Sequence, residues 1–213
     1  MTTDLERQAA QAEKGIAAMH KRVLIIQGHP DTAREHLCHA LAAAYADGAR
    51  AAGHDVECID IAQLDFPLVR SQADWEHGAL PPSLEPARRA IGAAEHLVLI
   101  FPLWLGDMPA LLKAFLEQVL RPAGAAPTDE ALASVRTLLA GKSARLVVTM
   151  GMPAVLYRWY FRAHSVRSLE RNVLAFVGVA PVRRSLIGMA GNLSPVRAGR
   201  WLGRMARLGS AAR

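Results

Sequence analysis

The chain has 213 residues, of which 52% are hydrophobic and 21% are charged, and its formal net charge is +6. This composition is typical of one globular domain with a sizeable core and excludes a disordered chain. No apolar run approaches the roughly 20 residues that span a bilayer. We expect residues 1–20 to form a helical or frayed N-terminal extension rather than a secretory signal, followed by a single domain at 21–213.

Charge is unevenly divided along the chain. From Gly141 onward there are thirteen Lys and Arg but one acid, Glu170. Such asymmetry favours either a polyanionic partner or a small phosphorylated ligand bound on one side. The two cysteines, Cys38 and Cys58, form no metal-binding pattern. Cysteine usage this low is typical of a reducing cytoplasm, where we expect the protein.

Short apolar runs alternate with amphipathic patterns along the chain. The runs predict strands at 21–27, 54–61, 97–101, 144–150 and 184–189, the last interrupted by Gly188. Helical spacing and capping predict helices at about 37–53, 86–94, 109–120, 165–176 and 195–208, a short helix capped by Thr128, and an irregular stretch at 62–82. Alternating strands and helices predict an α/β three-layer sandwich. Five parallel strands with a ligand loop after the first favour the flavodoxin-like order 2-1-3-4-5.

The loop after the first predicted strand, residues 28–37, lies where doubly wound folds cradle phosphate. It contains neither GxGxxG nor Gly-x4-Gly-Lys-[Ser/Thr], which argues against a dinucleotide fingerprint and a nucleoside triphosphatase loop. Its side chains can instead donate hydrogen bonds to a phosphate oxygen, from His29, Thr32, Arg34 and His36. A solvated surface turn is the alternative interpretation.

Residues 101–113 read Phe-Pro-Leu-Trp-Leu-Gly-Asp-Met-Pro-Ala-Leu-Leu-Lys and follow the third apolar run. This order predicts a strand, a short loop and a helix that begins at Pro109, where a missing N–H costs nothing. Trp104 would then lie at the sheet edge where open α/β sheets bind ligands, as a wall for a flat ring. Ordinary core packing is the alternative for a lone Trp.

The segment from Phe101 resembles the flavin-contacting segment of the NAD(P)H:quinone oxidoreductase family, and Gly28-His29-Pro30 resembles that family's opening motif. The resemblance extends over about residues 21–190. The family's Thr-Thr-Gly-Gly string is Val148-Thr149-Met150-Gly151 here, so only Thr149 and Gly151 match. The cofactor-binding residues that the resemblance implies are His29, His36, Leu37 and Cys38 toward the flavin phosphate and ribityl end, Pro102, Leu103, Trp104 and Leu105 along the isoalloxazine ring, and Thr149, Met150 and Gly151 at its polar edge.

The same resemblance implies two catalytic residues, Tyr157 and His164. In the family a Tyr and a His after the fourth strand stabilise the charge that forms on the flavin, as a fixed donor in a dry pocket can. The spacing here is one residue longer than the family's, and Tyr160 competes with Tyr157. The alternative is that Tyr157 is a core aromatic and that His164 starts a helix.

The last predicted helix carries a stripe of arginines at spacings of three and four residues: Arg197, Arg200, Arg204 and Arg207. A solvated outer face is the preferred interpretation. A nucleic-acid or acidic-lipid surface is disfavoured because aromatic residues are not interleaved with the arginines. Contact with the extra phosphate of NADPH is a third interpretation of the basic half.

The resemblance implies a flavin-dependent NAD(P)H oxidoreductase that transfers hydride to quinones or similar flat acceptors by a ping-pong mechanism. Its cofactor would be FAD or FMN, with NADPH or NADH as donor. We expect a homodimer, no bound metal, no nucleic-acid partner and no integral membrane span, while a peripheral membrane partner stays open. Two alternatives remain. One is a flavodoxin-type electron carrier, against which the pI near 9.9 speaks. The other is an ancillary subunit of a potassium efflux system.

Overall fold

The computed structural model describes residues 20–121, 135, 137 and 139–213. The expected N-terminal extension, His20 excepted, and the short helix expected at Thr128 lie outside these residues. Within the described ranges, no helix combines the length and the apolar character that a membrane crossing needs.

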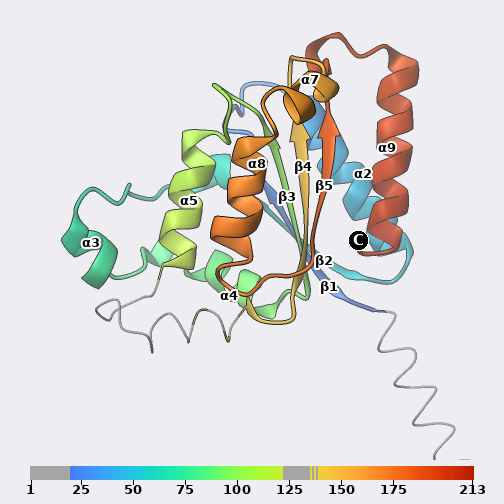
Figure 1. The fold of residues 1–213 in the computed structure, drawn as a ribbon. Helices are drawn as coiled ribbons and strands as arrows, with labels where there is room; N and C mark the ends of the chain where they lie inside the picture. Colours follow the sequence, from blue (N-terminus) through green and yellow to red (C-terminus); the bar gives the residue numbers. More distant parts are fainter. Residues whose placement is uncertain (1–19, 122–134, 136, 138) are drawn as a thin grey trace, which may run out of the picture.

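A five-stranded parallel sheet forms the middle layer of the molecule (Figure 1). Its strands are β1 (Arg22–Gln27), β2 (Asp55–Asp60), β3 (His96–Pro102), β4 (Ser143–Thr149) and β5 (Val182–Ile187). They are hydrogen-bonded in the order β2-β1-β3-β4-β5. The central strand β3 is buried over its whole length because helices cover both faces. The predicted three-layer architecture and strand order are therefore confirmed.

Helices lie on both faces of this sheet (Figure 1). α2 (Leu37–Ala51) and α9 (Pro195–Ser210) share one core with one face of the sheet. α4 (Glu85–Ala93), α5 (Ala110–Leu120) and α8 (His164–Ser168) share a second core with the other face. The remaining helical segments are α3 (Gln72–His77), α7 (Ala154–Trp159), the π-helix Leu169–Leu174 and three 3₁₀ turns at Ile61–Gln63, Pro82–Leu84 and Ala190–Asn192.

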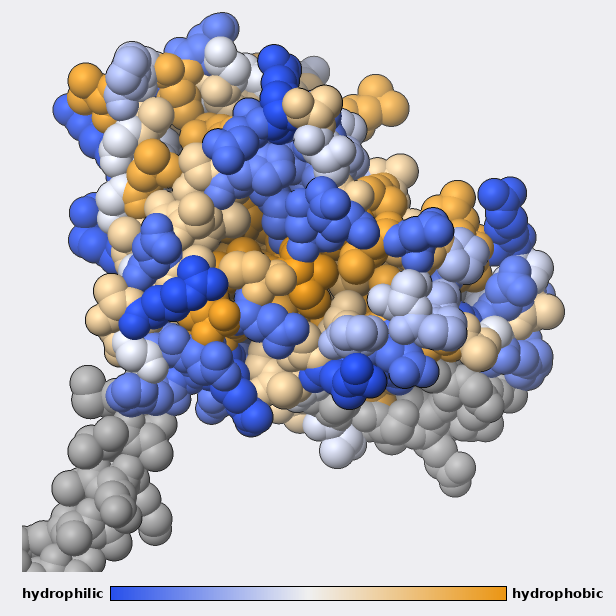
Figure 2. Space-filling view, turned by 180° about the vertical axis from the view of Figure 1, so that it is seen from behind, coloured by the Kyte–Doolittle hydropathy of each residue, from blue (hydrophilic) through white to orange (hydrophobic). Residues whose placement is uncertain are grey.

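Two glycines allow α2 and α9 to approach closely. A Cβ at Gly48 would lie 2.0 Å from the carbonyl oxygen of Ala206, and one at Gly209 would lie 2.1 Å from that of Tyr45. The C-terminal helix is thereby held against the sheet instead of standing free. Seen from behind, the surface shows hydrophobic residues near its middle, set between hydrophilic ones (Figure 2).

Three local predictions differ from the structure. β5 begins two residues before position 184 and ends at Ile187, because Gly188 passes against the loop after β4. A Cβ at Gly188 would lie 2.3 Å from the backbone nitrogen of Ala154. The helix predicted at 165–176 is α8 followed by a π-helix. The stretch expected to be irregular, 62–82, contains α3, whose N-cap Ser71 accepts a hydrogen bond from the backbone N–H of Asp74.

Candidate functional site

A cavity of about 240 Å³ lies at the carboxyl ends of the strands. Four loops meet there, those that follow β1, β3, β4 and β5. The lining residues are His29, His36, Leu37, Cys38, Pro102, Leu103, Trp104, Thr149, Met150, Gly151, Ala190 and Gly191. Open α/β sheets bind ligands at this edge. The structure thus brings together all the predicted cofactor-binding residues except Leu105, and their role in binding stays a prediction.

His29 lines this cavity and is held there by hydrogen bonds of the loop after β1. Its backbone N–H donates to Gln27 Oε1 at 3.1 Å, and its ring Nδ1 accepts from the backbone N–H of Asp31 at 3.2 Å. Because Nδ1 is an acceptor, the neutral ring carries its proton on Nε2, which becomes the donor toward a ligand. Burial lowers the pKa of His29, and the charges of His36 and His39 lower it further. The ring is therefore neutral at pH 7.

Three histidine rings gather at the start of α2. The rings of His29 and His36 are stacked with centroids 3.8 Å apart, and the ring of His39 lies 5.6 and 5.9 Å from theirs. His36 Nε2 lies 2.7 Å from Asp31 Oδ2. The first N–H groups of α2 have no partner within the helix, and the helix dipole favours an anion beside them. Within the described ranges, no three His, Cys, Asp or Glu side chains are arranged to hold a metal ion.

The loop after β3 is a tight turn that holds Trp104 beside His29. Trp104 and Asp107 exchange two backbone hydrogen bonds of 2.8 and 2.9 Å. Leu105 and Gly106 between them have φ values of 47° and 84°, which makes a type I′ turn. Trp104 is 48% exposed, whereas Leu105 at the turn tip is fully exposed and does not line the cavity. The resemblance predicts that Leu105 lines the flavin ring, but the turn directs this residue into solvent at its tip.

Cys38 and Thr149 lie where α2 meets the end of β4. Cys38 Sγ is 3.3 Å from Thr149 Oγ1, and both residues are buried. Burial raises the pKa of the Cys38 thiol to about 11, which excludes a thiolate at pH 7. The carbonyl oxygen of Thr149 accepts a 2.7 Å hydrogen bond from the backbone N–H of Leu103. These contacts fix the loops after β3 and β4 relative to each other.

Sequence reasoning missed two lining residues, Ala190 and Gly191, which come from the loop after β5. The backbone N–H of Ala190 donates to the Met150 carbonyl at 2.9 Å and so joins this loop to the one after β4. A Cβ at Gly151 or Gly191 would meet no atom within 4 Å. At these two positions the wall therefore consists of backbone without a side chain. A glycine in the loop after the last strand was the signal available in the sequence.

The two predicted catalytic residues do not line the cavity. Tyr157 is 3% exposed, and its hydroxyl lies 2.7 Å from Ser165 Oγ and accepts a 3.4 Å hydrogen bond from the backbone N–H of Val166. His164 is exposed and begins α8, after Arg162 and Ala163 turn the chain with φ values of 53° and 49°. Tyr157 is thus a buried aromatic and His164 the first residue of a helix, as in the alternative interpretation of the sequence. Their catalytic role stays a prediction.

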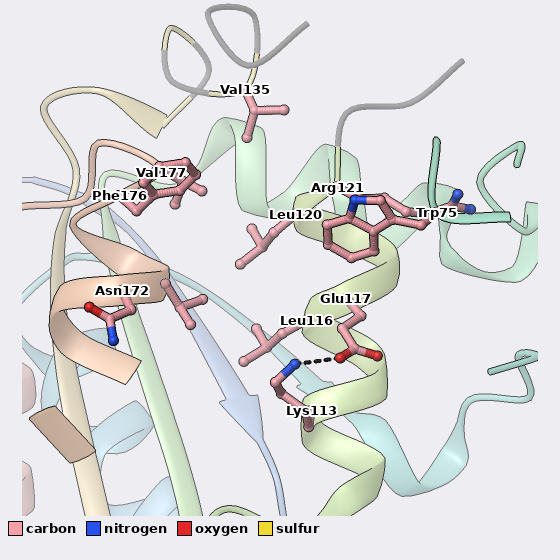
Figure 3. A pocket seen from close by; sticks show the side chains of 11 residues that line it. Trp75, Lys113, Leu116, Glu117, Leu120, Arg121, Val135, Asn172, Phe176 and Val177 are labelled. Atoms are coloured by element: carbon pink, nitrogen blue, oxygen red, sulfur yellow. Dashed lines mark hydrogen bonds and ion pairs between the residues drawn. The ribbon is translucent and has the colours of Figure 1, made fainter. Parts of the chain in front are cut away.

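A second pocket, of about 220 Å³, lies between α3, α5 and the segment after α8 (Figure 3). It shares no lining residue with the cavity at the strand ends. Its wall is mostly apolar, and its charged side chains already have partners in the protein. Lys113 pairs with Glu117, and Arg121 donates to the carbonyl oxygens of Asp74 and Ala79. Without converging polar groups, this pocket offers no reaction centre.

The five-stranded parallel sheet, with helices on both faces and a cavity at its carboxyl edge, defines a flavodoxin-like α/β protein. A family model described as "Flavodoxin-like fold" matches residues 21–199, and the chain belongs to this family. The resemblance found in the residues is confirmed at this level.

Individual relatives agree with the family. A Haemophilus influenzae protein described as an uncharacterized NAD(P)H oxidoreductase is 26% identical over 169 residues, which cover 78% of this chain and 82% of the relative. The solved structure of an NAD(P)H:quinone oxidoreductase from Methanothermobacter marburgensis gives a TM-score of 0.72 at 23% identity, over 91% of this chain and 100% of that chain. An FMN-dependent NADH-azoreductase from Bacillus anthracis in complex with FMN gives 0.63 at 15% identity, over 89% and 97%. The two structures establish likeness of fold.

Proposed function

We propose that this protein is a flavin-dependent NAD(P)H oxidoreductase. The observation that carries the proposal is one cavity in which an anion cradle at His29 adjoins a flat wall at Trp104 and Gly151. A flavin has the same two parts, a phosphate and a planar ring. The names of the relatives support this function: the Haemophilus protein is described as an NAD(P)H oxidoreductase, and the Bacillus azoreductase structure contains FMN.

The residues present match the chemistry of a flavin. His29 Nε2–H and the first N–H groups of α2, at Leu37 and Cys38, would hold the phosphate. Trp104 and the glycine-lined wall at Gly151 would hold the ring. When bound, FMN or FAD supplies two-electron chemistry, taking hydride from NAD(P)H and passing it to an acceptor. The protein contributes orientation and keeps water from the ring.

For the acceptor we propose a quinone or another flat electrophile, used in a ping-pong mechanism. The support is that one slot beside Trp104 would serve donor and acceptor in turn, so that the first product leaves before the acceptor enters. We also propose a cytoplasmic homodimer. The cysteines Cys38 and Cys58, which form no disulfide, agree with a reducing compartment, and the exposed Tyr160 and Phe161 offer apolar area for a second copy. Gel filtration at micromolar concentration tests the dimer, and a monomer there would exclude it.

The test of the function is anaerobic reduction of the flavin-loaded protein. We expect NADH or NADPH to bleach the yellow flavin and a quinone to restore the colour. Chromatography of the released cofactor identifies it as FMN or FAD. If neither nicotinamide bleaches the flavin while a separate reductase does, the protein is an electron carrier and the proposal is wrong.

A further inference from the structure

A cleft of about 400 Å³ lies along the outer edge of β5. It is distinct from the cavity at the strand ends, called the flavin cavity below. β5 is the last strand in the sheet order, so among the described strands its outer edge has no neighbour. Residues of α7, α8 and α9 surround this edge. The side chains that matter for recognition are Arg158, Trp159, Arg167, Arg184, Trp201 and Arg204.

The four arginines of this cleft carry far more positive charge than their surroundings neutralise. Glu170, the one acid after Gly141, lies 3.5 Å from Arg184. Within the described part of the chain, Arg158, Arg167 and Arg204 form no ion pair with an acid. Like charges gathered around one hollow repel each other until an anion enters, which makes the cleft an anion site.

One arginine of the cleft also acts on the interior. Burial lowers the pKa of Arg145, and the charge of Arg204 adds to the lowering. The guanidinium fork suits a phosphate in particular, because it donates two parallel hydrogen bonds.

Aromatic side chains in the same cleft add a second kind of recognition. Arg204 Cζ lies 5.0 Å from the centroid of the Trp201 ring, and Trp159 is exposed on α7. Indole faces and guanidinium planes stack on purine bases. The volume lies in the range of small-ligand pockets. Phosphate and heteroaromatic ring together describe a phosphorylated nucleoside.

The cleft and the flavin cavity share a boundary made by two short loops. The backbone N–H of Met189 donates to Met152 at 3.1 Å, and that of Ala190 donates to Met150 at 2.9 Å. Gly151 lines the cavity, and Ala154 lines the cleft. Three residues of chain span at most about 11 Å, so these two wall residues lie within the length of one extended dinucleotide.

We propose that this cleft binds the adenosine end of NADPH, with the 2′-phosphate among the arginines, and thereby selects NADPH over NADH. The inference rests on the proposed function, in which the nicotinamide end enters the flavin cavity. An extended nucleic acid is a poorer occupant because the arginines come from several elements around a hollow instead of following one continuous face.

The experiment uses flavin-loaded protein and two readouts. Calorimetry measures binding of 2′,5′-ADP and 5′-AMP, and stopped-flow reduction gives the ratio of kcat/KM for NADPH to that for NADH. We expect 2′,5′-ADP to bind at least about tenfold more tightly than 5′-AMP. Arg158→Gln and Arg204→Gln should each reduce both preferences about tenfold. Arg89→Gln, the same change on α4, should leave both preferences as they are.

Two results would overturn the cleft as the NADPH site. One is no measurable 2′,5′-ADP binding, and the other is binding that Arg158→Gln and Arg204→Gln leave unchanged. Thermal melting of each variant checks that it is folded. The calorimetric readout needs no turnover, so it decides the cleft even if neither nicotinamide reduces the flavin. Equal use of NADH and NADPH with no 2′,5′-ADP binding would overturn the cleft and leave the proposed function intact.

Discussion

The rings of His29 and Trp104 meet edge to face, with centroids 5.5 Å apart and planes inclined by 80°. The two residues come from the loops after β1 and β3, which are neighbours in the sheet although 75 positions separate them in the chain. The contact joins two loops that line the cavity, the proposed anion cradle and the proposed ring wall. Parallel strand pairing thus places both parts of the cavity at one edge.

Replacing Trp104 with Ala should weaken flavin binding about tenfold with little loss of stability. A stacked aromatic contributes about 0.5–1.5 kcal/mol beyond its buried area, whereas half of this indole is already in solvent. Leu105→Ala is the matched control at the neighbouring position, and we expect no change there because Leu105 does not line the cavity. Quenching of flavin fluorescence gives both dissociation constants. Equal effects of the two substitutions would contradict this assignment of the ring wall.

His29→Leu should weaken FMN binding at least tenfold while riboflavin binding changes little. Leucine has no hydrogen-bond donor in its side chain, and a hydrogen bond to a charged group is worth about 1.5–3 kcal/mol. Riboflavin lacks the phosphate, so it serves as the control ligand on the same variant. Titration of the apoprotein with each flavin measures the difference. A similar loss for both flavins would show that His29 supports the fold of the loop instead of contacting the phosphate.

His96 should make the folded protein less stable as pH falls. Burial lowers its pKa to about 3 from 6.5, with the charge of Lys21 adding to the effect, and Ser143 Oγ lies 2.8 Å from Nδ1. The unfolded chain therefore binds a proton that the folded chain refuses, so stability is retained above pH 6.5 and lost between 6.5 and 3. The slope from one such group approaches about 1.4 kcal/mol per pH unit.

Urea unfolding of His96→Gln across this pH window checks the prediction. We expect the variant to show a shallower pH dependence than the wild type, because the titrating group is gone. His77→Gln, on the exposed α3, controls for the loss of a histidine and should keep the wild-type slope. Parallel curves for the wild type and His96→Gln would contradict it.

Strand order and cavity position follow from local patterns, whereas the Tyr157 region does not. Alternating apolar runs and helical spacing predict the sheet, and parallel strands necessarily bring their loops to one edge. The place of Leu105 depends on a type I′ turn with positive φ at a non-glycine residue, which its sequence does not announce. The buried place of Tyr157 depends on contacts of its hydroxyl with Ser165 and Val166, which lie beyond a turn at Arg162 and Ala163 where positive φ again occurs without glycine. Where tertiary packing imposes an unusual φ value on a residue, the residue's own conformational propensity does not predict it.

Gly151→Ala should leave stability nearly unchanged but weaken flavin binding. A Cβ at Gly151 would meet no protein atom within 4 Å, so the protein accommodates the added methyl. Because Gly151 lines the cavity, a ring held against this wall should lose room to the methyl. Gly28→Ala is the contrasting variant, since its Cβ would lie 2.9 Å from Leu112 Cδ2 and 3.1 Å from Phe101 Cβ, and overpacking there should cost about 1–3 kcal/mol. Thermal melting with and without flavin separates the two effects. Full flavin affinity in Gly151→Ala would show that the ring does not lie against this wall.

Tyr157→Phe distinguishes the two roles that remain for this residue. The structure favours a supporting role, because the hydroxyl is engaged with Ser165 Oγ and the Val166 N–H, and its loss should cost about 1–2 kcal/mol of stability. The rate of flavin reduction by NAD(P)H should then change less than about twofold. Tyr160→Phe removes a hydroxyl from an exposed ring and should alter neither quantity. A fall of tenfold or more in the reduction rate of Tyr157→Phe, with stability retained, would instead establish the catalytic role that the family resemblance implies.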